Sequence, residues 1–255
     1  DSSWVILMTG GARGITAQIA LDLARKYQPR LILAGRSLPP SAAESDATAG
    51  VDQPEALKKI IIDTMRQQGR DFSLVDVENE YRRLRQEREM RSNIAAMRSA
   101  GSEVEYCQVD VRDEEAFGGL IDDIYERHGN IHAVIHGAGV IEDKLIKDKT
   151  LASFDRVLGT KTRSAFILSK KLRPESLKLL VLFSSVAGRF GNQGQCDYAA
   201  ANEVINKLAV YLNKQWPGRV VSINWGPWDQ SGMVSDGLRQ EFARRGVRLI
   251  PPAAG

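Results

Sequence analysis

A glycine-rich turn near the start of the chain has the residue types needed to hold a phosphate. The sequence TGGARGI at 9–15 follows an apolar run at 4–9 and leads directly into a helical period. Glycines let the backbone approach a pyrophosphate closely, and a helix N-terminus supplies amide donors and the positive end of its dipole. The turn therefore predicts a dinucleotide site, with a tight ligand-free turn as the alternative. Thr16 stands where many such turns have another glycine, so we expect different helix packing there.

The end of the expected second strand indicates which dinucleotide would bind. An acidic residue there would accept hydrogen bonds from a free ribose 2′-hydroxyl, but this chain has Arg36. Arginine favours the 2′-phosphate of NADP, because its planar fork binds phosphate in a bidentate manner. Arg13 can reach the same phosphate. We therefore expect NADPH, with an ordinary surface arginine as the alternative interpretation of Arg36.

Two further strand ends are expected to face the same ligand. Asp110 and Val111 suit the edge of the adenine ring, and the small residues of HGAG at 136–139 leave room for the cofactor. The residues expected to line the dinucleotide on these grounds are Thr9, Gly10, Gly11, Arg13, Gly14, Ile15, Gly35, Arg36, Ser37, Asp110, Val111, His136, Gly137, Ala138 and Gly139.

Polar side chains on apolar helical stripes are the strongest chemical signal. Lys161 falls within a stripe that runs from Phe154 to Leu168, and Tyr198 and Asn202 open the stripe of a later helix. A lysine is rarely buried without a partner, although it can also extend from the edge of a stripe to solvent. Ser184 and Ser185 end the strand between these helices. All these groups should meet at the carboxyl ends of the strands, where open α/β sheets bind ligands.

Three histidines are spaced four residues apart, at 128, 132 and 136. On one helix this spacing would favour a metal site. Gly129 and Asn130 interrupt any such helix, and His132 and His136 belong to an expected strand. We therefore expect no metal.

The elements that must position these groups form a doubly wound α/β fold. Short apolar runs at 4–9, 31–34, 104–109, 133–136, 179–183 and 220–224 are nearly continuous, which is typical of parallel strands covered on both faces. Helical periods lie between them, so we expect a Rossmann-like parallel sheet flanked by helices. The expectation is one catalytic domain over 1–255.

The segment 37–91 is longer than a simple β-α-β connection requires. Its polar part at 38–50 is expected to be a mobile loop, 54–69 has a helical pattern, and 77–97 is dense in arginine and glutamate. One interpretation is a solvated helical insertion decorated with salt bridges, and the other is a docking surface inside a larger assembly.

Composition excludes several classes of protein. The 255 residues are 43% hydrophobic, 26% charged and 7% aromatic, which is ordinary for a globular protein. The net charge of +3 makes no case for nucleic acid or an anionic membrane. Two cysteines are too few for a disulfide framework, and no apolar run is long enough to span a bilayer, so we expect a cytoplasmic protein.

Several motifs in one order resemble a known family. They are TGGARGI at 9–15, GRS at 35–37, DVRD at 110–113, HGAGV at 136–140, Lys161, FSSVAG at 183–188, GQCDYAAAN at 194–202 and INWGPW at 223–228. Together they resemble the ketoreductase domains of type I polyketide synthases and polyunsaturated fatty-acid synthases, within the short-chain dehydrogenase/reductase superfamily. Most members of that superfamily have a lysine four residues after the tyrosine. Here Asn202 stands there and Lys161 lies on the earlier helix, an exchange that resembles the synthase domains specifically.

The resemblance implies the roles of the site residues. Hydride passes from NADPH to a β-keto carbon, and Tyr198 protonates the developing alkoxide. Lys161 should hold the nicotinamide ribose and lower the pKa of Tyr198, since free tyrosine is a weak acid near neutrality. Ser185, favoured over Ser184, donates a hydrogen bond to the carbonyl oxygen, and Asn202 orients Lys161 or a relay water. The resemblance adds Lys161, Tyr198, Gly226 and Pro227 to the cofactor-binding residues.

The resemblance also bears on the product. In polyketide ketoreductases a Leu-Asp-Asp motif after this strand accompanies one product hand, and a tryptophan eight residues before the tyrosine accompanies the other. This chain has Ile141-Glu142-Asp143 and Phe190 at these places. We call the segment 141–143 the substrate-side loop. Its residue Asp143 therefore favours the 3R hydroxyacyl product. The alternative is that Glu142 and Asp143 form a solvated acidic turn.

The function expected from this resemblance is NADPH-dependent reduction of a β-ketoacyl chain carried by acyl carrier protein. The chain is expected to be excised from a larger synthase whose neighbouring domains are its partners, with its oligomeric state open. Two other functions stay open: a free-standing dehydrogenase for small carbonyl compounds, and a catalytically silent nucleotide-binding scaffold.

Overall fold

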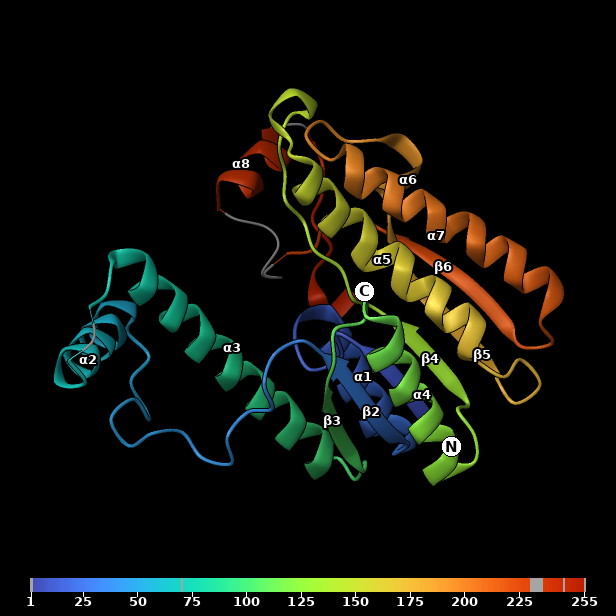
Figure 1. Ribbon diagram of the computed structural model, residues 1–255, viewed down its shortest axis with the longest axis horizontal. Coiled ribbons are helices and arrows are strands. Elements are labelled where there is room, and N and C mark those ends of the chain that lie inside the picture. The colour runs from blue at the N-terminus through green and yellow to red at the C-terminus, as the bar shows by residue number, and fades with distance from the viewer. Residues whose placement is uncertain (1, 70, 230–235, 245, 255) are drawn as a thin grey trace.

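The computed structural model describes residues 2–69, 71–229, 236–244 and 246–254, and Figure 1 shows its arrangement. Six parallel strands form one sheet in the order β3-β2-β1-β4-β5-β6. The strands are β1 (Val5–Thr9), β2 (Arg30–Gly35), β3 (Val104–Gln108), β4 (Ala133–His136), β5 (Leu179–Ser185) and β6 (Arg219–Trp225). All six expected strands are confirmed. The chain reverses its direction of travel across the sheet between β1 and β4, so a topological switch point lies there.

Helices cover both faces of the sheet, and further helices lie outside these layers. The helices are α1 (Gly14–Tyr27), α2 (Pro54–Gln67), α3 (Leu74–Ser99), α4 (Glu114–His128), α5 (Leu151–Lys171), α6 (Val186–Phe190), α7 (Cys196–Gln215) and α8 (Asp236–Arg244), with 3-10 turns at Ile146–Asp148 and Pro252–Ala254. One face is covered by α4, α5 and α7, and the other by α1 with the end of α3. Within the described residues no helix is both long and apolar enough to cross a membrane.

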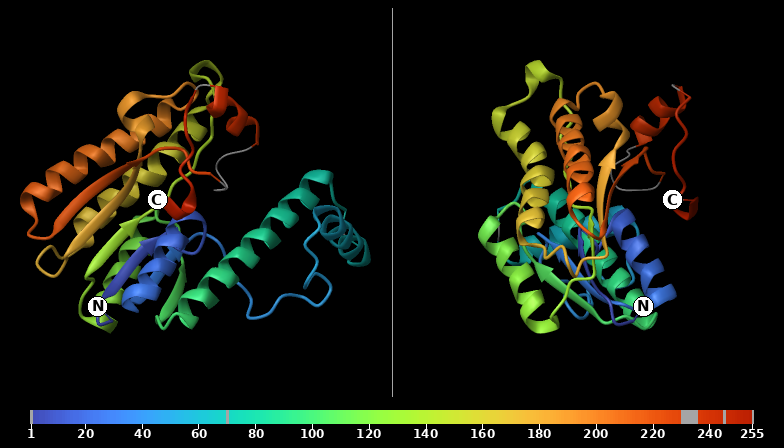
Figure 2. Two further views of the ribbon diagram at one scale, coloured as in Figure 1. Left: turned by 180° about the vertical axis from the view of Figure 1, so that it is seen from behind. Right: turned by 90° about the vertical axis from the view of Figure 1, so that its right-hand side faces the viewer.

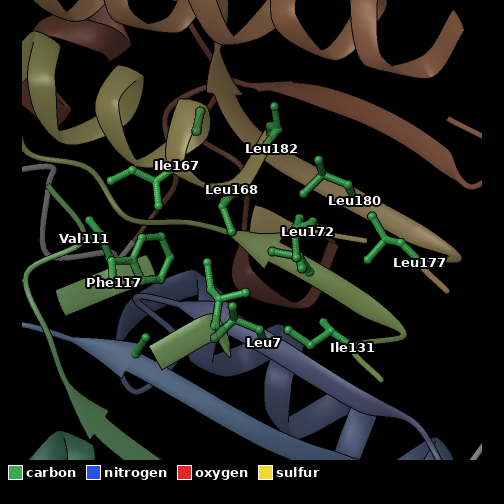
Figure 3. Close-up of a cluster of buried hydrophobic side chains, with 14 of the residues drawn as sticks. Leu7, Val111, Phe117, Ile131, Ile167, Leu168, Leu172, Leu177, Leu180 and Leu182 are labelled. Atoms are coloured by element: carbon green, nitrogen blue, oxygen red, sulfur yellow. The ribbon is translucent and has the colours of Figure 1, made fainter. Parts of the chain in front are cut away.

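Alternate residues of the strands enter two different cores. Leu7 of β1 belongs to a cluster with residues of α4, α5 and α7, part of which Figure 3 shows. Its neighbour Met8 belongs to a second cluster on the opposite face, with residues of α1 and α3. This division follows from the two-residue period of a strand and explains why consecutive residues of β1 are apolar.

The insertion is helical, but it is not separate from the core. Helix α2 and the first half of α3 extend away from the sheet as an arm (Figure 2), held together by Ile61, Met65 and Val77. The second half of α3 packs on the sheet through a buried set that begins at Met90 and includes Ile94 and Met97. The insertion is expected from the sequence to extend to residue 91, but α3 already contributes to the core at Met90.

The polar loop at 38–50, expected to be mobile and described throughout by the structure, contains no helix or strand and is attached to α3 by hydrogen bonds. Arg88 binds the Glu44 carboxylate at 2.6 Å and donates to the carbonyl oxygens of Thr48 and Val51. Arg91 donates to the carbonyl oxygen of Ser41 at 2.9 Å. Two arginines of the charge-dense helix, Arg88 and Arg91, thus hold the loop in place and are not simply solvated surface groups.

Candidate active site

The glycine turn lies where β1 and β4 end side by side. Gly10 has a φ of 74°, and a Cβ there would lie 3.4 Å from the carbonyl carbon of Gly137. A Cβ on Gly137 would lie 2.3 Å from Oγ1 of Thr16. The two glycines therefore allow the strand ends to approach, and the buried Thr16 fills the space that a glycine would leave.

The N-terminus of α1 contacts an anionic oxygen within the protein. The Gly14 amide donates to Oε1 of Glu89 at 2.8 Å, and Asn93 donates to the Ala12 carbonyl oxygen at 3.0 Å. Arg13, the N-cap residue, makes no capping hydrogen bond with its side chain. An amide that takes a carboxylate oxygen can take a phosphate oxygen, so the turn fits a pyrophosphate. The sequence gives no sign of this contact, because Glu89 is one of many glutamates on α3.

The end of β2 gathers the groups expected to select the cofactor. Arg36 is exposed, and its positive charge helps to lower the pKa of Asp110. Arg13 lies near Tyr106, whose hydroxyl donates to the Ser37 carbonyl oxygen at 2.9 Å. Both arginines therefore lie at the corner expected to receive a 2′-phosphate.

Asp110 has a partner that the sequence did not indicate. Arg112 binds its carboxylate at 2.6 Å and is the main cause of its lowered pKa. The Asp110 side chain is thus already engaged, so any contact with an adenine edge must be made beside this pair. Val111 is buried in the core.

Lys161 is buried at the centre of the site. Its side chain donates a hydrogen bond from Nζ to the Phe183 carbonyl oxygen at 2.5 Å, and its residue is 4% exposed. A Cβ on Gly139 would lie 3.0 Å from Cε of this lysine, so the small residue makes room for it. Burial lowers the pKa of Lys161 to about 8. The lysine on the apolar stripe is therefore a true interior lysine and does not extend to solvent.

Tyr198 lies next to Lys161 and Ser185. The Nζ atom of Lys161 is 5.9 Å from the centre of the Tyr198 ring. Burial raises the pKa of Tyr198, while hydrogen bonds with Ser185 and Asn202 lower it in part. The expectation that Lys161 lowers this pKa is not met here, because the ammonium is directed to the Phe183 carbonyl.

The two serines that end β5 are in different environments. Ser184 is buried, and its hydroxyl donates to the Asn202 carbonyl oxygen at 3.2 Å. Ser185 lies near enough to the Tyr198 phenol to lower its pKa, and its Oγ accepts a hydrogen bond from the Ala187 amide at 3.1 Å. The geometry thus supports the choice of Ser185 over Ser184.

Asn202 is fully buried one helical turn after Tyr198. Its Nδ2 donates to the Tyr198 carbonyl oxygen at 2.7 Å, and its Oδ1 has no hydrogen-bond partner in the described part of the chain. A buried amide oxygen without a donor is costly, so it is suited to receive a donor such as a water or an ammonium.

His136, the last residue of β4, links β1 to α5 through its two ring nitrogens. Its Nδ1 lies 2.7 Å from Oγ1 of Thr9, and its Nε2 lies 3.0 Å from Oγ of Ser164. Thr9 accepts the Ala138 amide with the same hydroxyl, and Ser164 donates to the Thr160 carbonyl oxygen. This pattern is satisfied by a neutral ring with its proton on Nε2, and burial lowers the pKa of His136 to about 3.

The other histidines are separate from His136. His132 stacks on Trp4, and His128 contacts Arg30. In the part of the chain that the structure describes, no three histidine, cysteine, aspartate or glutamate side chains are grouped to hold a metal ion.

The substrate-side loop is firmly connected to the helices around it. Glu142 accepts hydrogen bonds from Ser153 at 2.6 Å and from Arg156 at 2.9 Å, and Arg156 is the main reason that its pKa falls to about 2. Gln195 donates to Asp143 at 3.0 Å. The acidic pair therefore has specific partners and is more than a solvated turn. Phe190 is 84% exposed.

Gly226 and Pro227 follow β6 directly. The Pro227 carbonyl oxygen accepts the Ile250 amide at 2.8 Å, and a Cβ on Gly226 would lie 3.5 Å from the Ile250 side chain. The segment after β6 therefore packs against Ile250, near the end of the described chain.

The sequence is similar to known synthase proteins. Residues 5–230 match the family model described as KR domain. One component protein of the polyunsaturated fatty acid synthase of Thraustochytrium sp. is 33% identical over 258 residues, covering 98% of this chain and 9% of that protein. Polyketide synthase PksN of Bacillus subtilis is 35% identical over 158 residues, covering 60% of this chain and 3% of that protein. The chain thus spans a small part of the length of these relatives.

Solved structures have the same fold. An N-terminal ketoreductase from the macrolactin assembly line superposes with a TM-score of 0.73 and 27% identity, covering 100% of this chain and 41% of that one. PlmKR1, the ketoreductase from the first module of phoslactomycin biosynthesis in Streptomyces sp. HK803, has a TM-score of 0.74 and 26% identity, covering 98% of this chain and 48% of that one.

Proposed function

The chain belongs to the KR-domain family of ketoreductases, and on that premise we propose that it reduces a β-ketoacyl thioester to the β-hydroxyacyl thioester with NADPH. The acyl chain would be carried by acyl carrier protein within a larger polyketide or fatty-acid synthase in the cytoplasm. The observation that carries the proposal is the burial of Lys161 beside Tyr198, with Ser185 near enough to the same phenol to lower its pKa.

Each of these side chains has a role that its contacts support. NADPH, when bound, supplies the hydride that the β-keto carbon receives. Ser185 donates a hydrogen bond to the carbonyl oxygen, and Tyr198 gives that oxygen its proton as negative charge develops. Lys161 holds the nicotinamide ribose. Asn202, whose Oδ1 lacks a donor among the described residues, accepts a hydrogen bond from a relay water or from Lys161.

The cofactor would lie across the switch point between β1 and β4. The glycine turn at 9–15 takes the pyrophosphate, and Arg36 with Arg13 takes the 2′-phosphate. Two observations support the pyrophosphate site: Gly10 has no side chain between the turn and the end of β4, and the Gly14 amide already donates to an anionic oxygen. The position of Arg36 beside Asp110 supports the 2′-phosphate site.

We assign the 3R product to the substrate-side loop. A tethered chain that enters along Ile141–Asp143 presents one carbonyl face to the cofactor. Glu142 and Asp143 are tied to α5 and to the segment before α7, so this loop has a defined conformation from which to direct entry.

One experiment tests the proposed function against its alternatives. NADPH oxidation is measured with an N-acetylcysteamine β-ketothioester and with free small ketones, and the alcohol is analysed by chiral chromatography. A ketoreductase of this kind reduces the thioester to a mainly 3R alcohol. Reduction of the free ketones alone would favour a small-carbonyl dehydrogenase, and NADPH binding without any turnover would favour a silent scaffold.

A further inference from the structure

A buried ion pair lies beside the candidate active site and has no part in the roles assigned above. Nζ of Lys149 is 2.6 Å from Oδ2 of Asp197 and donates a second hydrogen bond to the Glu142 carbonyl oxygen at 2.7 Å. The two charged side chains are 2% and 1% exposed. The lysine thus joins the substrate-side loop to the start of α7.

Asp197 connects this pair directly to the proposed proton donor. Its second oxygen, Oδ1, accepts the Tyr198 amide at 2.8 Å. Helix α7 begins at Cys196, and its N-cap residue Gln195 makes no capping hydrogen bond with its side chain. Asp197 therefore satisfies an amide of the first turn that would otherwise be orphaned, and its negative charge is favoured at a helix N-terminus.

The loop and the start of α7 meet at two other points, both less enclosed. The Lys144 amide donates to the Gly194 carbonyl oxygen at 3.0 Å, and Gln195 donates to Asp143 at an exposed position. Lys149 reaches past these contacts into the interior. One ammonium therefore joins the Glu142 backbone to the Asp197 carboxylate, which in turn accepts the Tyr198 amide.

Burying two charges is costly, and a buried pair is weak evidence for stability by itself. What such a pair does well is to hold groups in one geometry, because either charge left alone would be strongly penalised. The pair between Lys170 and Glu114, at the far end of α5, is exposed. Water solvates either charge there when its partner is removed, so this pair does not fix the geometry of its surroundings.

We propose that Lys149 and Asp197 are positioning residues that set Tyr198 and the substrate-side loop relative to each other, and thereby control turnover and the choice of carbonyl face. This inference rests on the proposed function, in which Tyr198 is the proton donor. The pair touches no reacting atom. Its effect passes through the Tyr198 backbone on one side and the Glu142 backbone on the other.

The test compares Lys149→Met with the double variant Lys149→Met/Asp197→Asn. The single change leaves a buried carboxylate without a partner and can therefore unfold the chain. The double change removes both charges, and asparagine keeps an oxygen that can accept the Tyr198 amide. Lys170→Met is the matched control, since it removes an exposed lysine from an ion pair remote from the site.

The measurements are kcat and KM for the N-acetylcysteamine β-ketothioester, the enantiomer ratio of the alcohol, and the number and affinity of NADPH sites. We expect the double variant to bind NADPH as the parent does, to lose about 100-fold in kcat, and to change the enantiomer ratio. The ratio does not depend on how much protein is folded, so a merely structural role would leave it unchanged. The proposal is overturned if the double variant gives the enantiomer ratio of the parent and loses activity only in proportion to the fraction of protein that no longer binds NADPH.

Hydrogen exchange separates this result from a failure of the proposed function. Both variants at 149 should speed amide exchange in 142–149 and in 196–199, and Lys170→Met should not. If the parent reduces no thioester, the proposed function fails, and exchange still decides whether the ion pair holds these segments. Parental exchange in both segments of the double variant contradicts the positioning role.

Discussion

The Lys161 ammonium lies 5.9 Å from the centre of the Tyr198 ring, and its hydrogen bond goes to the Phe183 carbonyl oxygen. Lysine and phenol are therefore neighbours, but the hydrogen bond of the lysine goes to a backbone carbonyl and not to the phenol oxygen. Burial acts on both groups, lowering the pKa of Lys161 to about 8 and raising that of Tyr198. In each case burial favours the neutral form.

Stability should depend on pH through Lys161. Its pKa falls from 10.5 to about 8 in the folded chain, so the unfolded chain binds more protons between these values and stability rises with pH there. The burial penalty is fully present below pH 8 and is removed above 10.5. Lys161→Met should abolish this rise, which amounts to about 3 kcal/mol. Urea unfolding at a series of pH values measures it, and parallel curves for parent and variant would contradict the burial of the charge.

Cofactor selection should reside in Arg36. We expect Arg36→Ala to weaken NADPH binding far more than NADH binding, because only NADPH has the 2′-phosphate that the guanidinium can bind. Fluorescence titration with each cofactor gives the two affinities. Arg30→Ala is a suitable control, since this arginine binds Glu103 at the opposite end of β2. Equal losses for both cofactors would remove Arg36 from this role.

Glu89 should oppose cofactor binding. Its carboxylate accepts the Gly14 amide at 2.8 Å, where a phosphate oxygen is expected to bind, so the pyrophosphate must displace it. Glu89→Gln removes a negative charge from the α1 N-terminus and should tighten NADPH binding by about two- to fivefold, the size of an exposed helix-terminus interaction. Glu80→Gln, on the same helix but in the arm, serves as the control. Weaker binding by Glu89→Gln would show that the carboxylate helps to form the cofactor site.

The loop at 38–50 should be dispensable for folding. Replacing it with a short linker removes the Glu44 partner of Arg88 and the Ser41 partner of Arg91 but leaves the buried end of α3 in place. We expect the free energy of unfolding to change by about 1 kcal/mol or less, with NADPH binding retained. Met97→Ala, within the fully buried part of the same helix, should instead cost about 2–5 kcal/mol. Collapse of the fold on loop replacement would mean that the loop completes the core.

The sequence predicts the sheet well because its strands are covered on both faces. Leu7 and Met8 enter opposite cores, so consecutive positions of the central strands are apolar and the runs are easy to find. Lys161 and Tyr198 are found for a related reason, since polar groups on apolar stripes stand out. Ser185 is separated from Ser184 by the family pattern, and the structure adds the contact with Tyr198.

Other features have no local signal. Glu89 and Arg88 are two of many charges on α3, and only the folded chain shows that one reaches Gly14 and the other Glu44. Lys149 lies in a polar loop with other lysines, so nothing in its neighbourhood predicts its burial against Asp197. These contacts join residues that are distant in sequence, which periodicity cannot report.

Replacing Tyr198 with phenylalanine is the sharpest test of its assignment as the proton donor. The change removes the proposed proton donor and keeps the ring beside Lys161, so NADPH affinity should stay that of the parent. Reduction of an N-acetylcysteamine β-ketothioester should fall by about 100- to 10,000-fold, the usual contribution of a general acid. The measurement is the rate of NADPH oxidation with cofactor binding followed in parallel. Near-parental turnover by Tyr198→Phe would contradict the assignment of Tyr198 as the proton donor.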